Sequence, residues 1–163
     1  MSILEVSRVV DVDVATAWSV VNDQAYFGEL SPGLSRVEIL SGHGTEAIRR
    51  CWDKKGNHWD ESCPVYLEGQ RITFQIDPTT HPARRLIRRI TGTHEVEAVR
   101  IGRTRVAIRF DFQLRYGMLG WALTQLALRG VRTSAVAVVD GWQRRMLAEA
   151  GRVVEPKVGL APD

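Results

Sequence analysis

Near the C-terminal end of the chain the spacing of the apolar residues changes once, and this change constrains the fold more than any other feature. Residues 103–116 alternate between apolar and polar positions, which is typical of a strand with one buried face. Residues 118–150 then space their apolar side chains as in a helix of about 30 residues, roughly 45 Å long. Each element has a single apolar face, so we expect the helix to lie against a sheet.

The rest of the chain predicts mostly strands. A strand at 2–10 precedes two short helices at 14–22 and 24–30, the first capped by Asp13. Further strands are predicted at 34–41, 45–54, 57–67, 70–77 and 84–100. Short turns between consecutive strands favour antiparallel pairing. The sequence therefore predicts an α+β fold: a curved antiparallel sheet of about seven strands wrapped around the long C-terminal helix.

We expect one domain at residues 1–150 and an extended tail at 151–163, which contains two prolines and has little periodicity. No apolar run approaches the ~20 residues that span a bilayer. The first residues, MSILEVSRVVDVD, carry acids early and have no unbroken apolar core, so they do not resemble a signal peptide. We therefore expect a cytoplasmic protein, and the sequence leaves open whether it is a monomer or a homodimer.

Few residues point to metal or covalent chemistry. Cys51 and Cys63 are too few for a disulfide framework or a zinc site. The four histidines lack metal-ligand spacing, and the sequence has no nucleophile elbow, P-loop or Rossmann motif. We therefore expect neither a metal nor a cofactor.

Three motifs in this order of elements resemble the SRPBCC superfamily. Ala17-Trp18 is followed by Asp23 and Pro32, as in the opening helices of that superfamily. The segment GNHWDE matches a Gly-x-x-Trp-x-Glu pattern of bacterial members, and YGMLGWALTQLALR is similar to the entry of their long helix. Over about residues 3–150 the chain thus resembles helix-grip proteins: the birch-pollen allergen, StAR-related lipid-transfer domains and polyketide cyclase/dehydrases.

The resemblance implies a cavity between the curved sheet and the long helix that holds a hydrophobic or amphipathic molecule. Some members of the superfamily carry such molecules, others cyclise or dehydrate them, and others serve as interaction modules. The side chains that we expect at the cavity wall are Arg50, Trp52, Trp59, Glu61, Phe74, His94, Ile108, Phe110, Phe112, Trp121, Leu128 and Trp142.

Glu61 is in phase with apolar residues of its strand, which raises the question of its partner. A hairpin centred on Lys55-Gly56 would align Trp52 with Trp59 and Arg50 with Glu61 on the inner face. This register directs Cys51 to the face opposite Cys63. A four-residue loop would instead set Arg50 against Trp59.

We favour a structural Arg50–Glu61 ion pair in a partly wet interior. The alternatives are an anchor for a polar ligand group, or catalysis by Glu61 as a general acid or base. His94 is in phase with Gly92 and Val96 on the inner face. We favour a hydrogen-bonded core histidine there, with a catalytic role as the alternative.

Four arginines, Arg84, Arg85, Arg88 and Arg89, lie within six residues. We favour a solvated face, with attraction to an anionic membrane or an acidic partner as the alternative. Nucleic acid is disfavoured, because the outward residues of 103–116 lack interleaved aromatic side chains.

Two functions of different classes fit these features. The first is a carrier or binding protein for a hydrophobic small molecule, which we favour because the interior offers only one or two polar groups. The second is a cofactor-independent polyketide cyclase, aromatase or dehydratase acting in the same cavity. A protein- or ribosome-interaction module is a weaker third possibility.

Overall fold

The computed structural model describes residues 2–115 and 117–154, with side chains described at 2–115 and 129–151. The strands are β1 (Ser2–Val10), β2 (Leu34–Ser41), β3 (Ile48–Asp53), β4 (His58–Leu67), β5 (Arg71–Ile76), β6 (Ile87–Arg100) and β7 (Arg103–Leu114). The helices are α1 (Val14–Val21), α2 (Gln24–Leu30) and α3 (Gly117–Val154), with a short 3-10 helix at Gly44–Glu46.

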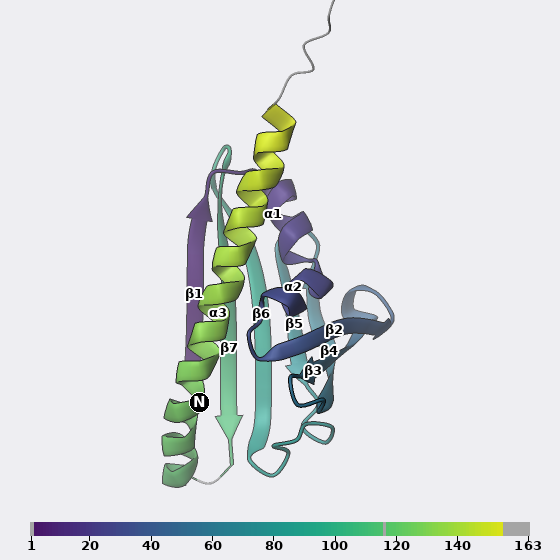
Figure 1. Ribbon diagram of the computed structural model, residues 1–163, viewed down its shortest axis with the longest axis vertical. Coiled ribbons are helices and arrows are strands. Elements are labelled where there is room, and N and C mark those ends of the chain that lie inside the picture. Colours follow the sequence, from purple (N-terminus) through teal and green to yellow (C-terminus); the bar gives the residue numbers. More distant parts are fainter. Residues whose placement is uncertain (1, 116, 155–163) are drawn as a thin grey trace, which may run out of the picture.

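All seven strands form one antiparallel sheet in the order β1-β7-β6-β5-β4-β3-β2. The first strand pairs with the last, and α1 and α2 connect β1 to the opposite edge of the sheet (Figure 1). α3 runs across the sheet on the side of β1 and β7, and α1 and α2 lie next to its upper half (Figure 1). This is the predicted helix-grip arrangement.

Two predicted strands begin later than their sequence patterns suggested. β3 starts at Ile48 because residues 44–46 form the 3-10 turn. β6 starts at Ile87 because residues 81–86 form turns, in which Arg84 N donates to His81 O and Leu86 N to Ala83 O. α3 continues to Val154, four residues past the predicted end of the domain.

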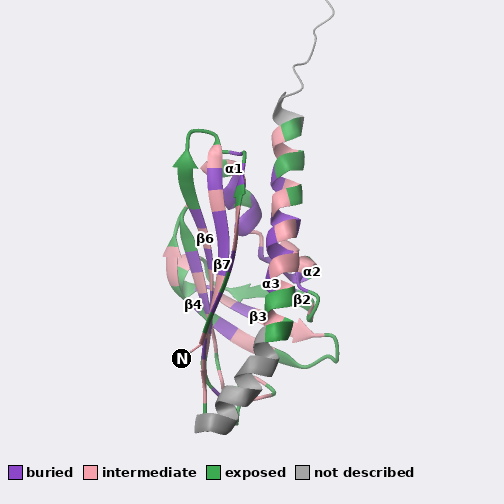
Figure 2. Cartoon of the chain, turned by 90° about the vertical axis from the view of Figure 1, so that its left-hand side faces the viewer, coloured by how far each residue is buried: buried purple, intermediate pink, exposed green. Residues whose placement is uncertain are grey.

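The core lies between the concave face of the sheet and the helices, and Figure 2 shows buried segments on both. Trp142 and Met146 of α3 are fully buried, as are Phe74 and Ile108 of the sheet. Gly141 allows α2 to approach α3, because a Cβ atom there would lie 2.2 Å from Cδ2 of Leu30. Gly130, in contrast, has no neighbour within 4 Å of that position, so of these two glycines Gly141 is the one that close packing requires.

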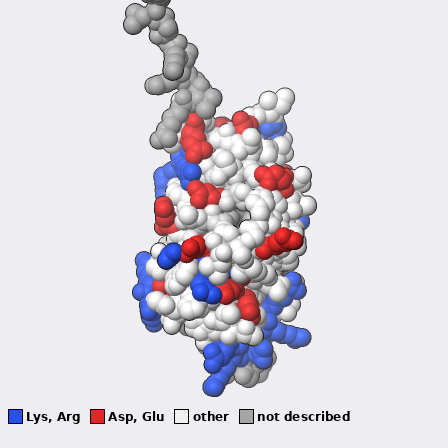
Figure 3. Space-filling model, turned by 90° about the vertical axis from the view of Figure 1, so that its right-hand side faces the viewer, with Lys and Arg blue, Asp and Glu red and all other residues white. Residues whose placement is uncertain are grey.

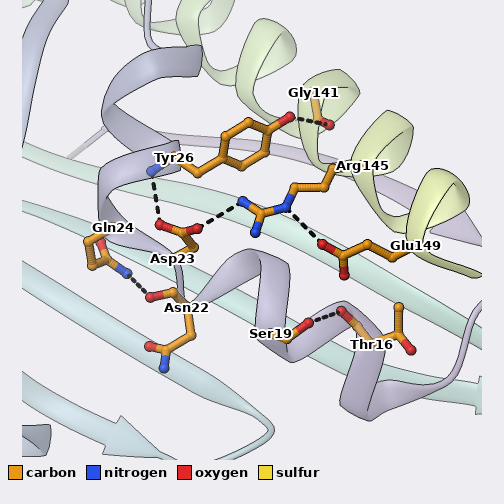
Figure 4. A network of polar contacts seen from close by, with 9 residues as sticks. All are labelled: Thr16, Ser19, Asn22, Asp23, Gln24, Tyr26, Gly141, Arg145 and Glu149. Atoms are coloured by element: carbon orange, nitrogen blue, oxygen red, sulfur yellow. Dashed lines mark hydrogen bonds and ion pairs between the residues drawn. The ribbon is translucent and has the colours of Figure 1, made fainter. Parts of the chain in front are cut away.

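Asp23 ties α2 to α3. Its side chain caps α2 by accepting from Tyr26 N at 3.0 Å, and its other oxygen lies 2.8 Å from Arg145 Nη1 (Figure 4). Arg145 also pairs with Glu149 at 2.9 Å, and the hydroxyl of Tyr26 donates to Gly141 O at 3.2 Å. These contacts hold the two helices over the upper end of the concave face.

The predicted register of the β3–β4 hairpin is wrong by one residue. The structure pairs Arg49 with Glu61 and Arg50 with Asp60, and it sets Trp52 opposite His58. The loop has three residues, closed by Asp53 N donating to Asn57 O at 2.9 Å, with Gly56 at φ +84°. Glycine is favoured at this left-handed position, where such loops form a bulge.

A shift of one residue exchanges the two faces of a strand. Arg50 and Trp52 therefore lie on the outer face and not at a cavity wall, which corrects both predictions. The guanidinium of Arg36 lies 4.7 Å from the centroid of the Trp52 ring. Cys51 is correspondingly buried on the inner face with Cys63, again opposite to expectation, and both are free thiols.

Candidate functional site

The concave face of the sheet is closed by the core at one end, and towards the other end some of its described side chains stay partly exposed. At the closed end, beneath α1, α2 and the C-terminal half of α3, Val96, Val106 and Ile108 are buried. Towards the other end, Trp59, Ile90 and Phe110 pack against the core but stay partly exposed. We call these three side chains the open part of the concave face: they offer apolar and aromatic surface to a ligand, whereas the closed end is filled by the core.

A buried ion pair lies beside this open surface. Arg49 Nη2 is 2.6 Å and Nε 2.7 Å from Glu61 Oε2, and the two side chains are 4% and 7% exposed. Arg49 Nη1 donates to the side-chain oxygen of Gln24, which brings α2 into the cluster. The guanidinium carbon also lies 3.6 Å from the centroid of the Phe74 ring, a favourable cation–π distance. The charge of Arg49 is thus compensated on three sides.

The second oxygen of Glu61 is occupied as well. Trp59 Nε1 donates to Oε1 at 2.8 Å, and the thiol of Cys51 lies 3.5 Å from the same atom. Burial, and next the charge of Glu61, raise the pKa of Cys51 far above that of an ordinary thiol. Cys51 is therefore a protonated donor and not a nucleophile, because nucleophilic attack requires the thiolate.

His94 is enclosed by aromatic rings. Its ring centroid lies 4.9 Å from that of Phe27 and 5.2 Å from that of Trp142, and the residue has no exposed surface. Burial, and then the charge of Arg49, lower the pKa of His94 to about 3, although the nearby Val21 carbonyl acts in the opposite sense. Neither ring nitrogen has a hydrogen-bond partner among the described residues.

This environment does not suit the catalytic role considered for His94. A general acid or base works best with a pKa near the operating pH, and it must reach the substrate. A neutral imidazole without exposed surface meets neither condition. The expected hydrogen bond to a core partner is also absent among the described residues.

Sequence patterns missed three residues near this site. Gln24 reaches Arg49 from α2, His81 lies with its ring centroid 4.9 Å from that of Trp59, and Tyr66 borders a separate pocket. Burial lowers the pKa of His81, and its Nδ1 accepts from Ala83 N at 3.0 Å. His81 lies between the predicted strands 70–77 and 84–100, and the folding of loop 77–86 back towards β4 has no periodic signal.

The separate pocket has a volume of about 200 Å³, and its lining includes Phe74 but not Trp59. Asn22 and Gln24 form one side of it, and the turn at residues 42–44 with Tyr66 forms the other. The Tyr66 hydroxyl accepts from Asn22 Nδ2 at 3.4 Å and donates to Glu68. Burial, and then Glu68, raise the pKa of Tyr66 to about 12, so this hydroxyl stays protonated at neutral pH.

The structure thus places most of the predicted cavity residues on the inner side. The buried ones are Glu61, Phe74, His94, Ile108, Phe112 and Trp142, and the partly exposed ones are Trp59 and Phe110. The side chains of Trp121 and Leu128 lie outside the described residues.

In the described part of the chain, no three His, Cys, Asp or Glu side chains gather as a metal site. Among the described helices, even α3 lacks the apolar length that crossing a bilayer requires.

A curved antiparallel sheet that grips one long helix, with an apolar concave face, defines a helix-grip protein. The chain belongs to the family described as polyketide cyclase / dehydrase and lipid transport, whose model matches residues 1–149. The resemblance to the SRPBCC superfamily is thereby confirmed. A comparison with curated proteins finds no match.

Several solved structures share this fold. TTHA0849 from Thermus thermophilus is 16% identical, with a TM-score of 0.70 over 91% of this chain and 99% of that chain. The ZhuI aromatase/cyclase from Streptomyces sp. R1128 is 17% identical, with a TM-score of 0.65 over 98% and 99%. Norcoclaurine synthase from Thalictrum flavum, in complex with dopamine and hydroxybenzaldehyde, is 12% identical, with a TM-score of 0.70 over 90% and 87%. At these identities the likeness extends to the fold alone.

Proposed function

We propose that this protein binds a hydrophobic or amphipathic small molecule on the open part of its concave face. One observation carries the proposal: Trp59, Ile90 and Phe110 point inward from three strands and yet remain partly exposed. Covering such surface contributes about 25 cal/mol per Å², so a medium-sized apolar ligand has an adequate driving force. The family name and the aromatase/cyclase and synthase relatives support a ligand of this kind.

The polar groups favour binding over catalysis. Both oxygens of Glu61 are engaged by Arg49 and Trp59, and His94 is neutral and enclosed. Steering a long polyketone through cyclisation requires several donors that face the substrate. We therefore retain a cofactor-independent cyclase or dehydratase as the second candidate, supported by the family name and by Trp59, whose indole N–H joins the open surface to Glu61.

The proposal is tested by titrating the protein with prodan, an uncharged naphthalene probe whose emission shifts to the blue in an apolar site. Phe110→Arg places a charge on the open surface and is expected to weaken binding by about tenfold or more. Ile3→Arg is the matched control, because Ile3 lies on the outer face of the neighbouring strand and is 49% exposed. It is expected to bind the probe as the parent protein does.

Circular dichroism of each variant separates lost binding from lost folding. Ile90→Arg provides a second substitution of the same surface if Phe110→Arg is unstable. Trp142 is unsuitable for this test, because it is fully buried and its replacement reports on the core. Equal probe affinity in folded Phe110→Arg, Ile90→Arg and parent protein would place the site elsewhere.

A further inference from the structure

One end of the sheet carries an excess of positive charge. Because the strands are antiparallel, the β3–β4 turn, the loop 77–86 and the end of β7 all lie at this end. Figure 3 shows Lys and Arg side chains gathered at the lower end of the molecule, below most of the acidic side chains of that face. We name seven exposed residues of these segments the basic end: Lys54, Lys55, Arg84, Arg85, Arg88, Arg89 and Arg115.

Among the described residues, no ion pair neutralises the charges of the basic end. Elsewhere on the sheet Arg50, Arg105 and Arg109 each pair with a carboxylate, whereas within the described part of the chain none of the seven does so. The nearby acids Asp53 and Asp77 are engaged in their own turns. Asp53 accepts from Lys55 N and Asn57 N, and Asp77 accepts from Thr79 N. The basic end is therefore available to an anionic partner.

The loop that carries the arginines also exposes an apolar side chain. Leu86 lies between Arg85 and Arg88 and is 38% exposed, and Pro82 is exposed nearby. Basic residues interleaved with apolar ones suit a membrane interface, where the charges meet headgroups and the apolar groups enter the lipid. Residues 77–89 contain no Phe, Tyr or Trp, so the loop lacks the stacking groups that single-stranded nucleic acid requires.

The basic end lies next to two of the three side chains of the open part of the concave face. Trp59 is the second residue of β4, just after the Lys54–Lys55 turn, and Ile90 follows Arg89 on β6. A flat anionic surface that contacts the basic end would therefore lie close to these partly exposed apolar side chains.

We propose that the basic end docks the protein on an anionic phospholipid membrane and presents the open concave face to the lipid. This inference rests on the proposed function for its purpose, since docking places the apolar site where a hydrophobic molecule dissolves. The attraction itself depends only on the basic end, at roughly 1 kcal/mol for each Lys or Arg near an anionic surface.

The test is vesicle flotation of the purified protein, with phosphatidylcholine vesicles compared with vesicles that contain about 30% phosphatidylglycerol. Binding is expected only to the anionic vesicles, and it should fall as NaCl is raised from about 0.1 to 0.5 M. Arg84→Gln/Arg85→Gln should weaken the vesicle affinity by about tenfold or more. The matched control is Arg100→Gln/Arg144→Gln, which removes the same charge from exposed positions outside the basic end.

Equal binding to neutral and anionic vesicles, or equal losses in the two double variants, would overturn the proposal. Binding to polyglutamate or to a DNA oligonucleotide without binding to anionic vesicles would also overturn it, in favour of another polyanion. Prodan titration of the same variants distinguishes the two proposals, because the probe is uncharged. Arg84→Gln/Arg85→Gln should leave prodan binding unchanged. A parent protein that binds anionic vesicles but not prodan would contradict the proposed ligand site and leave the membrane proposal standing.

Discussion

Arg49 and Glu61 form an ion pair on the inner face of the β3–β4 hairpin, and one residue closer to the turn on each strand Arg50 and Asp60 form another on the outer face. The shortest N–O distance is 2.6 Å in both pairs. The inner side chains are 4% and 7% exposed, whereas the outer ones are 32% and 25% exposed. The hairpin therefore presents the same chemistry in two environments, which makes the outer pair a control for the inner one.

The inner pair is expected to show strong coupling in a double-mutant cycle. Arg49→Met and Glu61→Gln should each reduce the free energy of unfolding by about 3–5 kcal/mol, because each leaves a buried partner unsatisfied. The double variant should recover part of this loss. Urea unfolding of the four proteins measures the coupling energy.

The outer pair is the control for that cycle. Arg50→Met and Asp60→Asn should each cost less than about 1 kcal/mol, because solvent screens a pair with this exposure. A larger coupling energy for Arg50–Asp60 than for Arg49–Glu61 would contradict the register of the hairpin and the assignment of its faces.

His94 is expected to make the protein less stable as the pH is lowered. Its pKa of about 3 in the folded protein lies below the ~6.5 of an unfolded chain. Between these two pKa values only the unfolded state binds the proton. The stability that His94 contributes is therefore complete above pH ~6.5, and the free energy of unfolding declines by up to about 1.4 kcal/mol per pH unit as the pH falls towards 3. His94→Phe should reduce this slope between about pH 6.5 and 5, as measured by urea unfolding at several pH values.

A residual slope is expected in His94→Phe, because burial also lowers the pKa of His81. His58→Phe, at an exposed histidine, is the matched control and should retain the parent slope. Identical slopes in His94→Phe and the parent protein would show that His94 is not held neutral by the fold.

Gly130 and Gly141 of α3 are expected to respond in opposite directions to alanine. Gly141→Ala puts a Cβ atom 2.2 Å from Leu30 Cδ2, so Leu30 must move, and we expect a net loss of about 1–3 kcal/mol. Gly130→Ala meets nothing within 4 Å and should gain up to about 1 kcal/mol in helix propensity. Thermal unfolding measures both effects, and a Gly141→Ala protein as stable as Gly130→Ala would argue against close packing of α2 on α3.

Asp23 combines a helix cap with an ion pair, and two substitutions separate them. Burial raises its pKa, but the Tyr26 amide and Arg145 outweigh this, so the pKa lies below its usual value. Asp23→Asn keeps a capping side chain but loses the pair, and should cost less than about 1 kcal/mol because both partners are one-third exposed. Asp23→Ala loses both and should cost about 1–2 kcal/mol.

The Asp23 pair is present above the ordinary carboxyl pKa, and its contribution should disappear as the pH falls through the lowered value. Asp13→Asn is the control for the cap, because the structure gives Asp13 a cap hydrogen bond to Thr16 N but no ion pair within the described residues. A cost for Asp23→Asn no larger than that for Asp13→Asn at neutral pH would show that Arg145 contributes nothing measurable.

Local sequence patterns predict most of the strands and helices of this fold and the side of each that faces the core. The alternation from Arg103 to Leu114 identifies the inward residues of β7, and the spacing of Ala135, Val138 and Trp142 identifies the buried side of α3. Asp13 is the cap that the sequence predicted. Such features depend on residues a few positions apart, and physical chemistry gives those residues fixed directions in a strand or helix.

The tertiary structure decided what depends on distances between remote segments. Whether Glu61 meets Arg49 or Arg50 depends on one residue in the β3–β4 loop, because a strand exchanges faces at every step. Gln24 reaches Arg49 only because α2 is held over the sheet, partly through Arg145 of α3, more than a hundred residues further along the chain. Trp59, Ile90 and Phe110 share the inward pattern of buried neighbours, and how far they stay exposed depends on how far the helices cover the concave face. Periodicity defines the side of an element on which a residue lies, but only packing between elements determines what covers it.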